Sequence, residues 1–189
     1  MGPVVAGVDL KIAADGEILV RGDLLMKGYW RDDAATSAVI QDGWLHTGDL
    51  GEVDADGFIT ITGRKKDIIV NSGGDNIAPG RVEALLTIEP EIEQAMVDGD
   101  KRPWLAAVIV PSEEVRSLAS SPDALATMVG EAVERANSRL SQLERVRRFI
   151  IADEAFSTEN GQMTATLKVR RHIVGDLYRD RLDALYPQK

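Results

Sequence analysis

The chain has 189 residues, of which 44% are apolar, and a formal net charge of −9. That apolar share is enough for a packed core, so wholesale disorder is excluded. An acidic chain is not attracted to a nucleic-acid backbone or an anionic membrane, so neither is an expected partner.

Two residue types are scarce, which excludes several kinds of site. The chain has no cysteine and only two histidines, His46 and His172, so disulfides, thiol nucleophiles and a Cys- or His-based metal centre are not expected. No signal pattern opens the chain, and no apolar run reaches the length of a transmembrane segment. We therefore expect a cytoplasmic location, and peripheral association with a membrane stays open.

Short strands joined by tight turns are predicted for the first 62 residues. Asp15-Gly16 and the later run Asp54-Ala55-Asp56-Gly57 are typical of hairpin turns. Asp32 or Asp33 is expected to cap a helix over 34–40. Strands this short form a small sheet that needs a neighbour to cover its other face. The expected strands cover residues 8–13, 17–21, 51–53 and 58–62.

The composition changes near Gly63, which predicts a domain boundary there. Residues 1–62 carry 4 Lys and Arg against 11 Asp and Glu, whereas residues 63–189 carry 18 against 20. Beyond the boundary the pattern is mixed α and β. The expected strands cover residues 68–70, 92–98, 105–110 and 147–151.

Three helices are predicted in this second part. Pro79-Gly80 introduces one over 81–88, and apolar residues at helical spacing within 123–140 indicate a long amphipathic helix. After a polar loop at 157–166, a closing helix is expected to turn four apolar side chains inward: Ile173, Leu177, Leu182 and Leu185.

Two segments near the boundary can carry chemistry. An Asp after a Gly, as in Thr47-Gly48-Asp49, is usually a turn residue, but its carboxylate can also accept from two hydroxyls, as acidic residues do with a ribose. The run 63–67 (GRKKD) is either a solvated turn or a functional linker. Arg64 brings a permanent planar charge suited to a phosphate or a ribose edge.

Two further segments lie beyond the boundary. Asn71-Ser72-Gly73-Gly74 is either a flexible loop or a place where the missing Cβ atoms let a ligand approach the backbone. A lone lysine such as Lys168 is usually a solvated surface charge. It stands, however, in the patterned run Thr164-x-Thr166-x-Lys168-x-Arg170-Arg171, whose arginines are expected to be helix-surface or docking charges.

Taken together, three segments resemble the later signature motifs of the AMP-forming acyl-activating ligases, most closely those of long-chain fatty acyl-CoA synthetases. They are 42–51 (DGWLHTGDLG), 63–74 (GRKKDIIVNSGG) and 164–171 (TATLKVRR), in that order. The Ser/Thr/Gly-rich phosphate loop and the aromatic-Gly-x-Thr-Glu segment that precede them in that family are not found. The resemblance therefore implies the C-terminal part of an enzyme.

The resemblance implies an α+β fold with two domains. Residues 1–62 correspond to the β-rich end of the large N-terminal, adenylate-binding domain, 63–67 to the hinge, and 68–189 to a mobile, compact α+β C-terminal lid domain. Gly28-Tyr29-Trp30 resembles a Gly-Tyr element of the family, and we expect its aromatic rings to pack internally.

The resemblance also implies roles for individual residues. Asp49 and Arg64 correspond to nucleotide-binding residues, with Asp49 on the ribose hydroxyls, and Lys66 to the hinge residue. Gly73, with Gly74 beside it, corresponds to the channel for the pantetheine arm of coenzyme A.

Lys168 corresponds to the catalytic lysine of adenylation. The family motif usually has proline where this chain has Ala165, a departure that leaves the lysine in place. No metal ligand is assigned within the chain.

The reaction implied has two steps. ATP and a fatty acid give acyl-AMP and pyrophosphate with Mg2+, which residues outside this chain are expected to hold; coenzyme A then displaces AMP. Because the phosphate loop is missing, the 189-residue chain is expected to be inactive alone, with the rest of the N-terminal domain as its intramolecular partner. Two alternatives stay open: an acyl-AMP ligase that loads an acyl-carrier protein, and a non-catalytic module that binds nucleotide or a partner domain.

Overall fold

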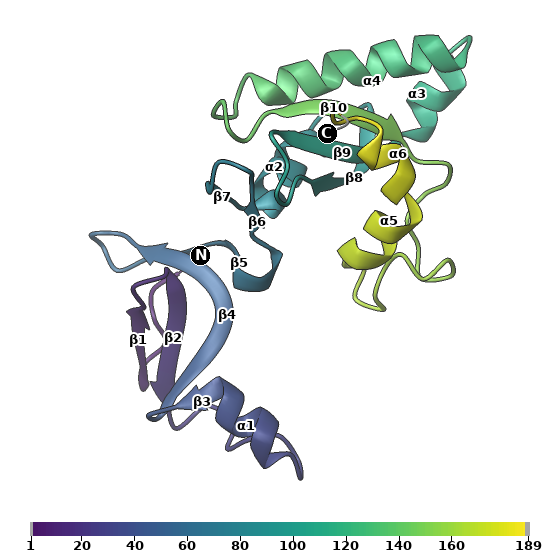
Figure 1. Ribbon diagram of the computed structural model, residues 1–189. Helices are drawn as coiled ribbons and strands as arrows, with labels where there is room; N and C mark the ends of the chain where they lie inside the picture. Colours follow the sequence, from purple (N-terminus) through teal and green to yellow (C-terminus); the bar gives the residue numbers. More distant parts are fainter. Residues whose placement is uncertain (1, 188–189) are drawn as a thin grey trace. The chain divides into compact units, whose positions relative to one another are not determined.

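The computed structural model describes residues 2–187, which separate into two compact units with a boundary between Ile68 and Ile69 (Figure 1). We call residues 2–68 unit 1 and residues 69–187 unit 2. Both combine helices with strands, so the α+β prediction is confirmed. Among the described residues, no helix is long and apolar enough to cross a membrane.

Unit 1 is an antiparallel sheet with one helix. Its strand order is β1-β2-β4-β3, and β5 pairs with the remaining part of β4. Helix α1 (Asp33–Val39) begins after Asp32, whose carboxylate accepts from the amide of Ala35 at 2.8 Å, as the capping prediction requires. The strands are β1 (Val8–Ile12), β2 (Glu17–Gly22), β3 (Ile40–Gln41), β4 (Trp44–Val53) and β5 (Ile59–Arg64).

Strand β4 is longer than the sequence predicts. The sequence predicts a strand over 51–53, but β4 begins at Trp44 and curves through the whole segment (Figure 1). Gly48 adopts a φ of 70°, and the pairing with β5 shifts between Leu50 and Gly51, so the strand bends instead of ending. Asp49 therefore lies inside a strand and not in a turn.

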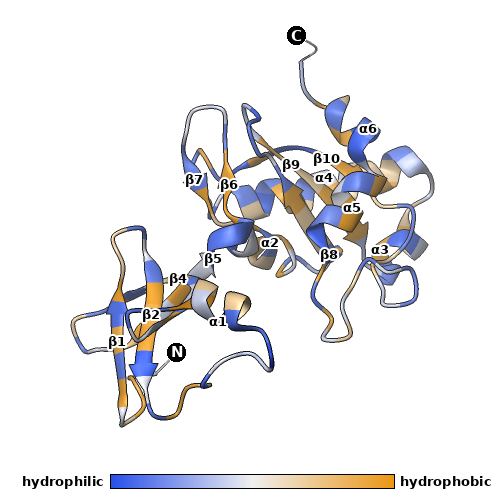
Figure 2. Ribbon diagram, turned by 60° about the horizontal axis from the view of Figure 1, so that its bottom comes forward, coloured by the Kyte–Doolittle hydropathy of each residue, from blue (hydrophilic) through white to orange (hydrophobic). Residues whose placement is uncertain are grey.

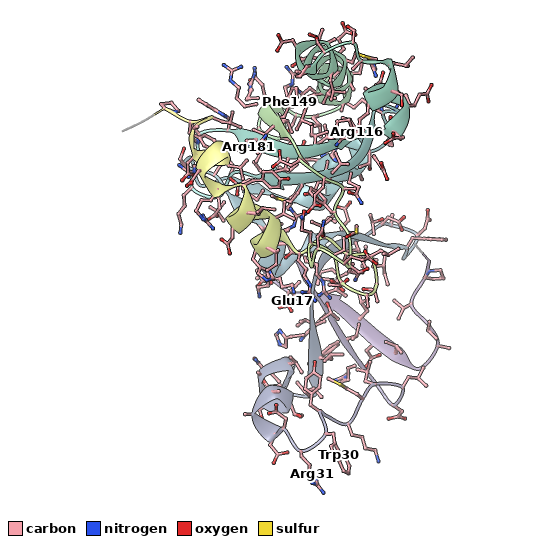
Figure 3. The ribbon with its side chains drawn as sticks, turned by 90° about the vertical axis from the view of Figure 1, so that its right-hand side faces the viewer. Glu17, Trp30, Arg31, Arg116, Phe149 and Arg181 are labelled. Carbon is pink, nitrogen blue, oxygen red and sulfur yellow. The ribbon has the colours of Figure 1, made fainter. Side chains whose placement is uncertain are left out.

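Unit 1 buries very little of its surface. Among its described residues only Glu17, Ile18 and Leu19 are buried, which fits the expectation that this sheet needs a neighbour. The prediction that the aromatic rings of Tyr29 and Trp30 pack internally is wrong, because these residues are 49% and 85% exposed. Trp30 projects from the edge of the ribbon (Figure 3).

The physical reason is the close approach of Gly28 to α1. A Cβ on Gly28 would lie 2.8 Å from the side chain of Thr36, whose hydroxyl accepts from the amide of Tyr29 at 2.9 Å. The backbone is thereby held against the helix, and the ring of Trp30 projects outward, where the Arg31 guanidinium lies 5.4 Å from it.

Unit 2 is built on a three-stranded sheet with helices on both faces. Strand β9 (Leu105–Pro111) is central, antiparallel to β8 (Ile92–Asp98) and parallel to β10 (Val146–Ile151). Every residue of β9 is buried, because both faces of the sheet are covered. A separate pair of short strands, β6 (Ile69–Val70) and β7 (Asn76–Ile77), precedes the first helix.

The helices divide between the two faces. Helices α2 and α4 pack through Val82, Val129 and Val133 onto one face, whereas α5 and α6 pack through Val174 and Leu182 onto the other (Figure 1). Apolar residues are accordingly concentrated on the strands of this sheet (Figure 2). The helices are α2 (Pro79–Leu86), α3 (Glu113–Leu118), α4 (Pro122–Asn137), α5 (Arg171–Leu177) and α6 (Arg179–Asp183).

Two local predictions in unit 2 need correction. Helix α3 was not expected, because its six residues are too few to show a helical period. The closing helix is divided at Tyr178, where φ is −100° and ψ 11°. Tyr178 itself turns inward with Val174 and Leu182, whereas Leu177, expected inside, is 60% exposed.

Candidate functional site

Asp49 and Arg64 form an ion pair across two neighbouring strands of unit 1. They are direct partners in the β4–β5 register, and Arg64 Nε donates to Asp49 Oδ1 at 2.6 Å. The hydrogen bond that Arg64 donates to Asp49, together with the negative charge of Asp49, raises the pKa of the Arg64 guanidinium. Asp49 Oδ2 has no partner among the described residues, so it can accept from a ligand hydroxyl. The structure thus brings together the two residues predicted for the nucleotide.

Asp49 also borders an apolar hollow of unit 1. A cavity of about 290 Å³ is lined by Asp49, by Thr47 and by four aliphatic side chains, those of Leu10, Ile18, Ile59 and Ile61. The Thr47 hydroxyl donates to the carbonyl of Ile18 at 2.7 Å and accepts from the amide of Asp49 at 3.1 Å. The polar end of this cavity is therefore held by one hydrogen bond to the neighbouring strand β2 and one within β4.

The predicted hinge residue lies in a single 3-10 turn, Lys65–Asp67, at the end of unit 1. Lys66 is exposed and forms no ion pair with any described residue. Lys65 differs, because its ammonium lies 2.6 Å from Asp15 Oδ2 and 3.0 Å from Glu17 Oε2. The turn thus combines one tethered lysine with one free lysine.

Glu17 is a buried carboxylate that the sequence reasoning did not single out. Burial acts to raise its pKa, but hydrogen bonds from His46, Lys65 and the amide of Gly48 outweigh that effect and hold the pKa below the ordinary value. The ionised form is therefore the one that this site stabilises. The sequence signal is its position directly after the turn residue Gly16 and before three consecutive apolar residues of β2.

Gly73 and Gly74 lie in the loop between β6 and β7 of unit 2. Asn71 Oδ1 accepts from the amides of Gly73 and Asp75 at 2.8 and 3.0 Å, so the loop is a hydrogen-bonded turn and not a loose segment. A Cβ on Gly73 would meet side-chain oxygens of Asn71 and Asp75 at 3.2 Å, and Gly74 has a φ of 87°. The local structure thus explains why glycine occupies each of these two positions. Their role in binding coenzyme A stays a prediction.

Lys168 lies at the tip of a tight hairpin in unit 2. The amide of Thr164 donates to the Lys168 carbonyl at 2.9 Å, and the Lys168 amide donates to Thr164 Oγ1 at 3.1 Å. Leu167 completes the turn with a φ of 57°. The Lys168 side chain is exposed. The hydrogen bonds of this hairpin form although Ala165 stands where the family motif usually has proline. The Lys168 ammonium group is therefore presented to solvent by an ordered backbone.

The base of this hairpin is anchored by Arg171, which was expected to be a surface or docking charge. Its guanidinium donates to Glu83 Oε2 on α2 and to the carbonyl of Val97 on β8, the latter at 3.2 Å. Glu83 Oε1 in turn accepts from the amide of Val97 at 2.7 Å. Arg171 therefore joins the Lys168 segment to the central part of unit 2.

Arg171→Met should lower the free energy of unfolding by about 1–3 kcal/mol, because it leaves a largely buried carboxylate without its guanidinium. The Glu83 side chain is 16% exposed. The matched control is Arg179→Met, since Arg179 pairs with Asp176 at the surface, with side chains 62% and 64% exposed. That change should stay within about 0.5 kcal/mol. Urea denaturation measures both, and equal losses would show that Arg171 anchors nothing.

A basic pocket of unit 2 was also missed by the sequence reasoning. Pro103, Trp104 and the start of β10 line a cavity of about 540 Å³ that contains three arginines, Arg145, Arg147 and Arg148. None of the three forms an ion pair with a described residue, and the buried Nε of Arg145 has no hydrogen-bond partner. Glu134 also lines the cavity. Unpaired guanidinium groups in a hollow suit a ligand with several phosphates.

The described residues offer no metal centre. No group of three or more His, Cys, Asp or Glu side chains within residues 2–187 is placed to hold a metal ion. The Mg2+ implied by the family resemblance has no fitting ligand set in this part of the chain, so no step is assigned to it here.

Comparison with known proteins finds a matching family and similar sequences. A sequence model described as "AMP-binding enzyme C-terminal domain" matches residues 66–189. The long-chain-fatty-acid–CoA ligase FadD15 of Mycobacterium tuberculosis is 42% identical over 202 residues, which cover 98% of this chain and 34% of that protein. The chain thus spans about a third of the length of this curated relative.

Solved structures agree in fold. The adenylation domain of a carboxylate reductase from Mycobacterium chelonae superposes with a TM-score of 0.86 at 26% identity, covering 97% of this chain and 31% of that one. O-succinylbenzoate coenzyme A synthetase from Bacillus subtilis, solved in complex with AMP, gives a TM-score of 0.71 at 30% identity, covering 90% and 34%. By these matches the chain belongs to the AMP-forming acyl-activating ligases, in the C-terminal portion that the matched family describes.

Proposed function

We propose that this chain is the C-terminal part of a fatty acyl-CoA ligase, which activates a fatty acid with ATP and transfers the acyl group to coenzyme A. The observation that carries the proposal is the state of the three motifs. The Asp49–Arg64 pair leaves a carboxylate oxygen free, and an ordered hairpin presents Lys168 to solvent. The similarity to a long-chain-fatty-acid–CoA ligase supports the substrate class.

In the first step, a carboxylate attacks the α-phosphate of ATP, and two anions must approach each other. Lys168 offers a compact ammonium that offsets this repulsion and stabilises the charge developing on the bridging oxygens. Asp49 would accept from the ribose hydroxyls, while Arg64 holds that carboxylate in place. The bond between the α- and β-phosphates breaks, pyrophosphate leaves and acyl-AMP forms; Mg2+, when bound by other parts of the ligase, neutralises phosphate charge.

In the second step, the thiolate of coenzyme A attacks the acyl carbonyl, and AMP leaves with the electron pair. We propose that rotation about Lys66 withdraws Lys168 and brings Gly73 and Gly74 to the pantetheine arm. An exposed lysine without an ion pair suits a pivot, because its surroundings change between the two states.

The basic pocket favours coenzyme A over a carrier protein as the acceptor. Coenzyme A carries three negatively charged phosphate groups on a compact nucleotide. The cavity is lined by three positively charged arginines without an ion pair, Arg145, Arg147 and Arg148. The alternative acceptor, an acyl-carrier protein, is kept because adenylation domains of carboxylate reductases share the fold. The third alternative is a non-catalytic binding module. It predicts that the full-length protein forms no acyl-AMP.

The proposed function is tested by supplying full-length ligase with ATP, a fatty acid and either coenzyme A or carrier protein, and weighing the product. An acyl-CoA mass supports the proposal, and an acylated carrier alone would overturn the choice of acceptor. The 189-residue chain by itself should give no fatty-acid-dependent ATP–pyrophosphate exchange. Robust exchange by that chain would show that the missing segments are not needed.

Arg145→Met in the full-length ligase should raise the KM for coenzyme A about tenfold to a hundredfold and leave adenylation unchanged, because one charge-assisted contact to a phosphate contributes about 1.5–3 kcal/mol. Arg179→Met, at the exposed ion pair of α6, is the control. If both variants keep the wild-type KM, the basic pocket takes no part in acceptor binding.

A further inference from the structure

Glu17, at the start of β2, is a buried carboxylate that the proposed reaction does not use. Its side chain, labelled in Figure 3, is 5% exposed, and it is the only buried charged residue among those described in unit 1. A carboxylate is stable in such a place only when its oxygens are hydrogen-bonded. Its partners therefore show what the burial holds together.

The donors to Glu17 come from β4, which carries Asp49, and from the 3-10 turn that directly follows Arg64 at the end of β5. Oε1 accepts from the amide of Gly48 at 2.9 Å, and Gly48 directly precedes Asp49. Oε2 accepts from Lys65 Nζ at 3.0 Å, and Lys65 directly follows Arg64. His46 Nδ1 lies 3.1 Å from the same oxygen. One carboxylate thus binds the residue next to each member of the Asp49–Arg64 pair.

The same contacts fix the chain just before the predicted pivot. Lys65 has a second anchor, because Asp15 Oδ2 lies 2.6 Å from its ammonium. Lys66, the next residue, is exposed and has no ion pair with a described residue. A rotation in this segment would therefore begin after Lys65, where the tether ends.

We propose that Glu17 is a positioning residue with two tasks: it sets the geometry of the Asp49–Arg64 pair, and through Lys65 it fixes the unit 1 side of the hinge. This inference rests on the proposed roles of Asp49 and Lys66. It predicts that glutamine, which keeps the shape but supplies one acceptor oxygen and no charge, cannot satisfy Gly48 and Lys65 together.

The first test uses the 189-residue chain and needs no catalysis. In Glu17→Gln, hydrogen exchange of the Gly48 amide should accelerate at least about tenfold, because its buried acceptor is lost or reoriented. In Lys65→Met, 15N relaxation should show a more mobile segment 65–67, with Lys65→Arg restoring the order. Asp9→Asn is the control, since Asp9 pairs with Arg21 at the surface of the same sheet.

The second test separates positioning from mere stability. In full-length ligase, Glu17→Gln should raise the KM for ATP about tenfold and leave the kcat of adenylation within about twofold, because the nucleotide contact and not the reacting lysine is disturbed. A fall in kcat with unchanged KM, or Gly48 exchange equal to that of Asp9→Asn, would overturn the inference. Should Glu17→Gln fail to fold, Lys65→Met gives the same decision through the order of 65–67. A wild-type ligase without activity would reject the proposed function but leave the exchange result to judge Glu17.

Discussion

Replacement of Lys168 by alanine in the full-length ligase should slow formation of acyl-AMP by about 10²–10³-fold, the usual loss when a charge that stabilises the transition state is removed. Thioester formation from supplied acyl-AMP should proceed at nearly the wild-type rate. In this second step the triphosphate has already been consumed, so Lys168 has no developing charge between carboxylate and α-phosphate to stabilise. Pyrophosphate release and acyl-CoA formation, followed separately, measure the two half-reactions.

The hairpin makes this substitution a clean one. The Lys168 contacts with Thr164 are made by its backbone, so alanine keeps them, and the exposed side chain contributes little to packing. Lys101→Ala is a matched control, because Lys101 is an 89% exposed lysine in another turn of unit 2. Equal loss of both half-reactions in Lys168→Ala would contradict the assigned role.

The second large effect is expected at Asp49. Asp49→Ala should raise the KM for ATP about tenfold to a hundredfold, since each hydrogen bond from a hydroxyl to a carboxylate contributes about 1.5–3 kcal/mol. The substitution also leaves the Arg64 guanidinium without its partner in the β4–β5 pairing. Initial rates of adenylation at varied ATP concentration measure the change.

Asp9→Ala is the control for this prediction, because it removes a carboxylate that pairs with an arginine elsewhere in the same sheet. Its KM for ATP should equal that of the wild type. If Asp49→Ala and Asp9→Ala behave alike, the ribose assignment of Asp49 is wrong.

Much of the local structure could be predicted from the residues. The hairpin at Asp15-Gly16, the cap of α1 at Asp32 and the amphipathic helix α4 depend on neighbours within a few positions, and all three are found. Predictions that required distant contacts fared worse. In the closing helix Leu182 is buried as predicted, but Leu177 is exposed and Tyr178 is buried in its place, because the break at Tyr178 reflects how α5 and α6 pack on the sheet.

In the candidate site, too, the motif residues could be predicted from the sequence, but their contacts could not. Asp49, Arg64, Lys66, Gly73 and Lys168 could be named from the order of the motifs, although their roles stay predictions. The partners that hold them could not be named in this way. Glu17 lies 48 positions from Lys65, and Glu83 lies 88 positions from Arg171.

The sequence by itself determined the family, the α+β class and the residue types available for chemistry, because motif order, turn residues and hydrophobic periods are local properties of the chain. Only the tertiary structure decided that Asp49 is inside a bent strand, that Arg64 neutralises it, and that one buried carboxylate joins Gly48 to Lys65. Strand register and burial bring these groups together, and both depend on pairings between segments far apart in the chain.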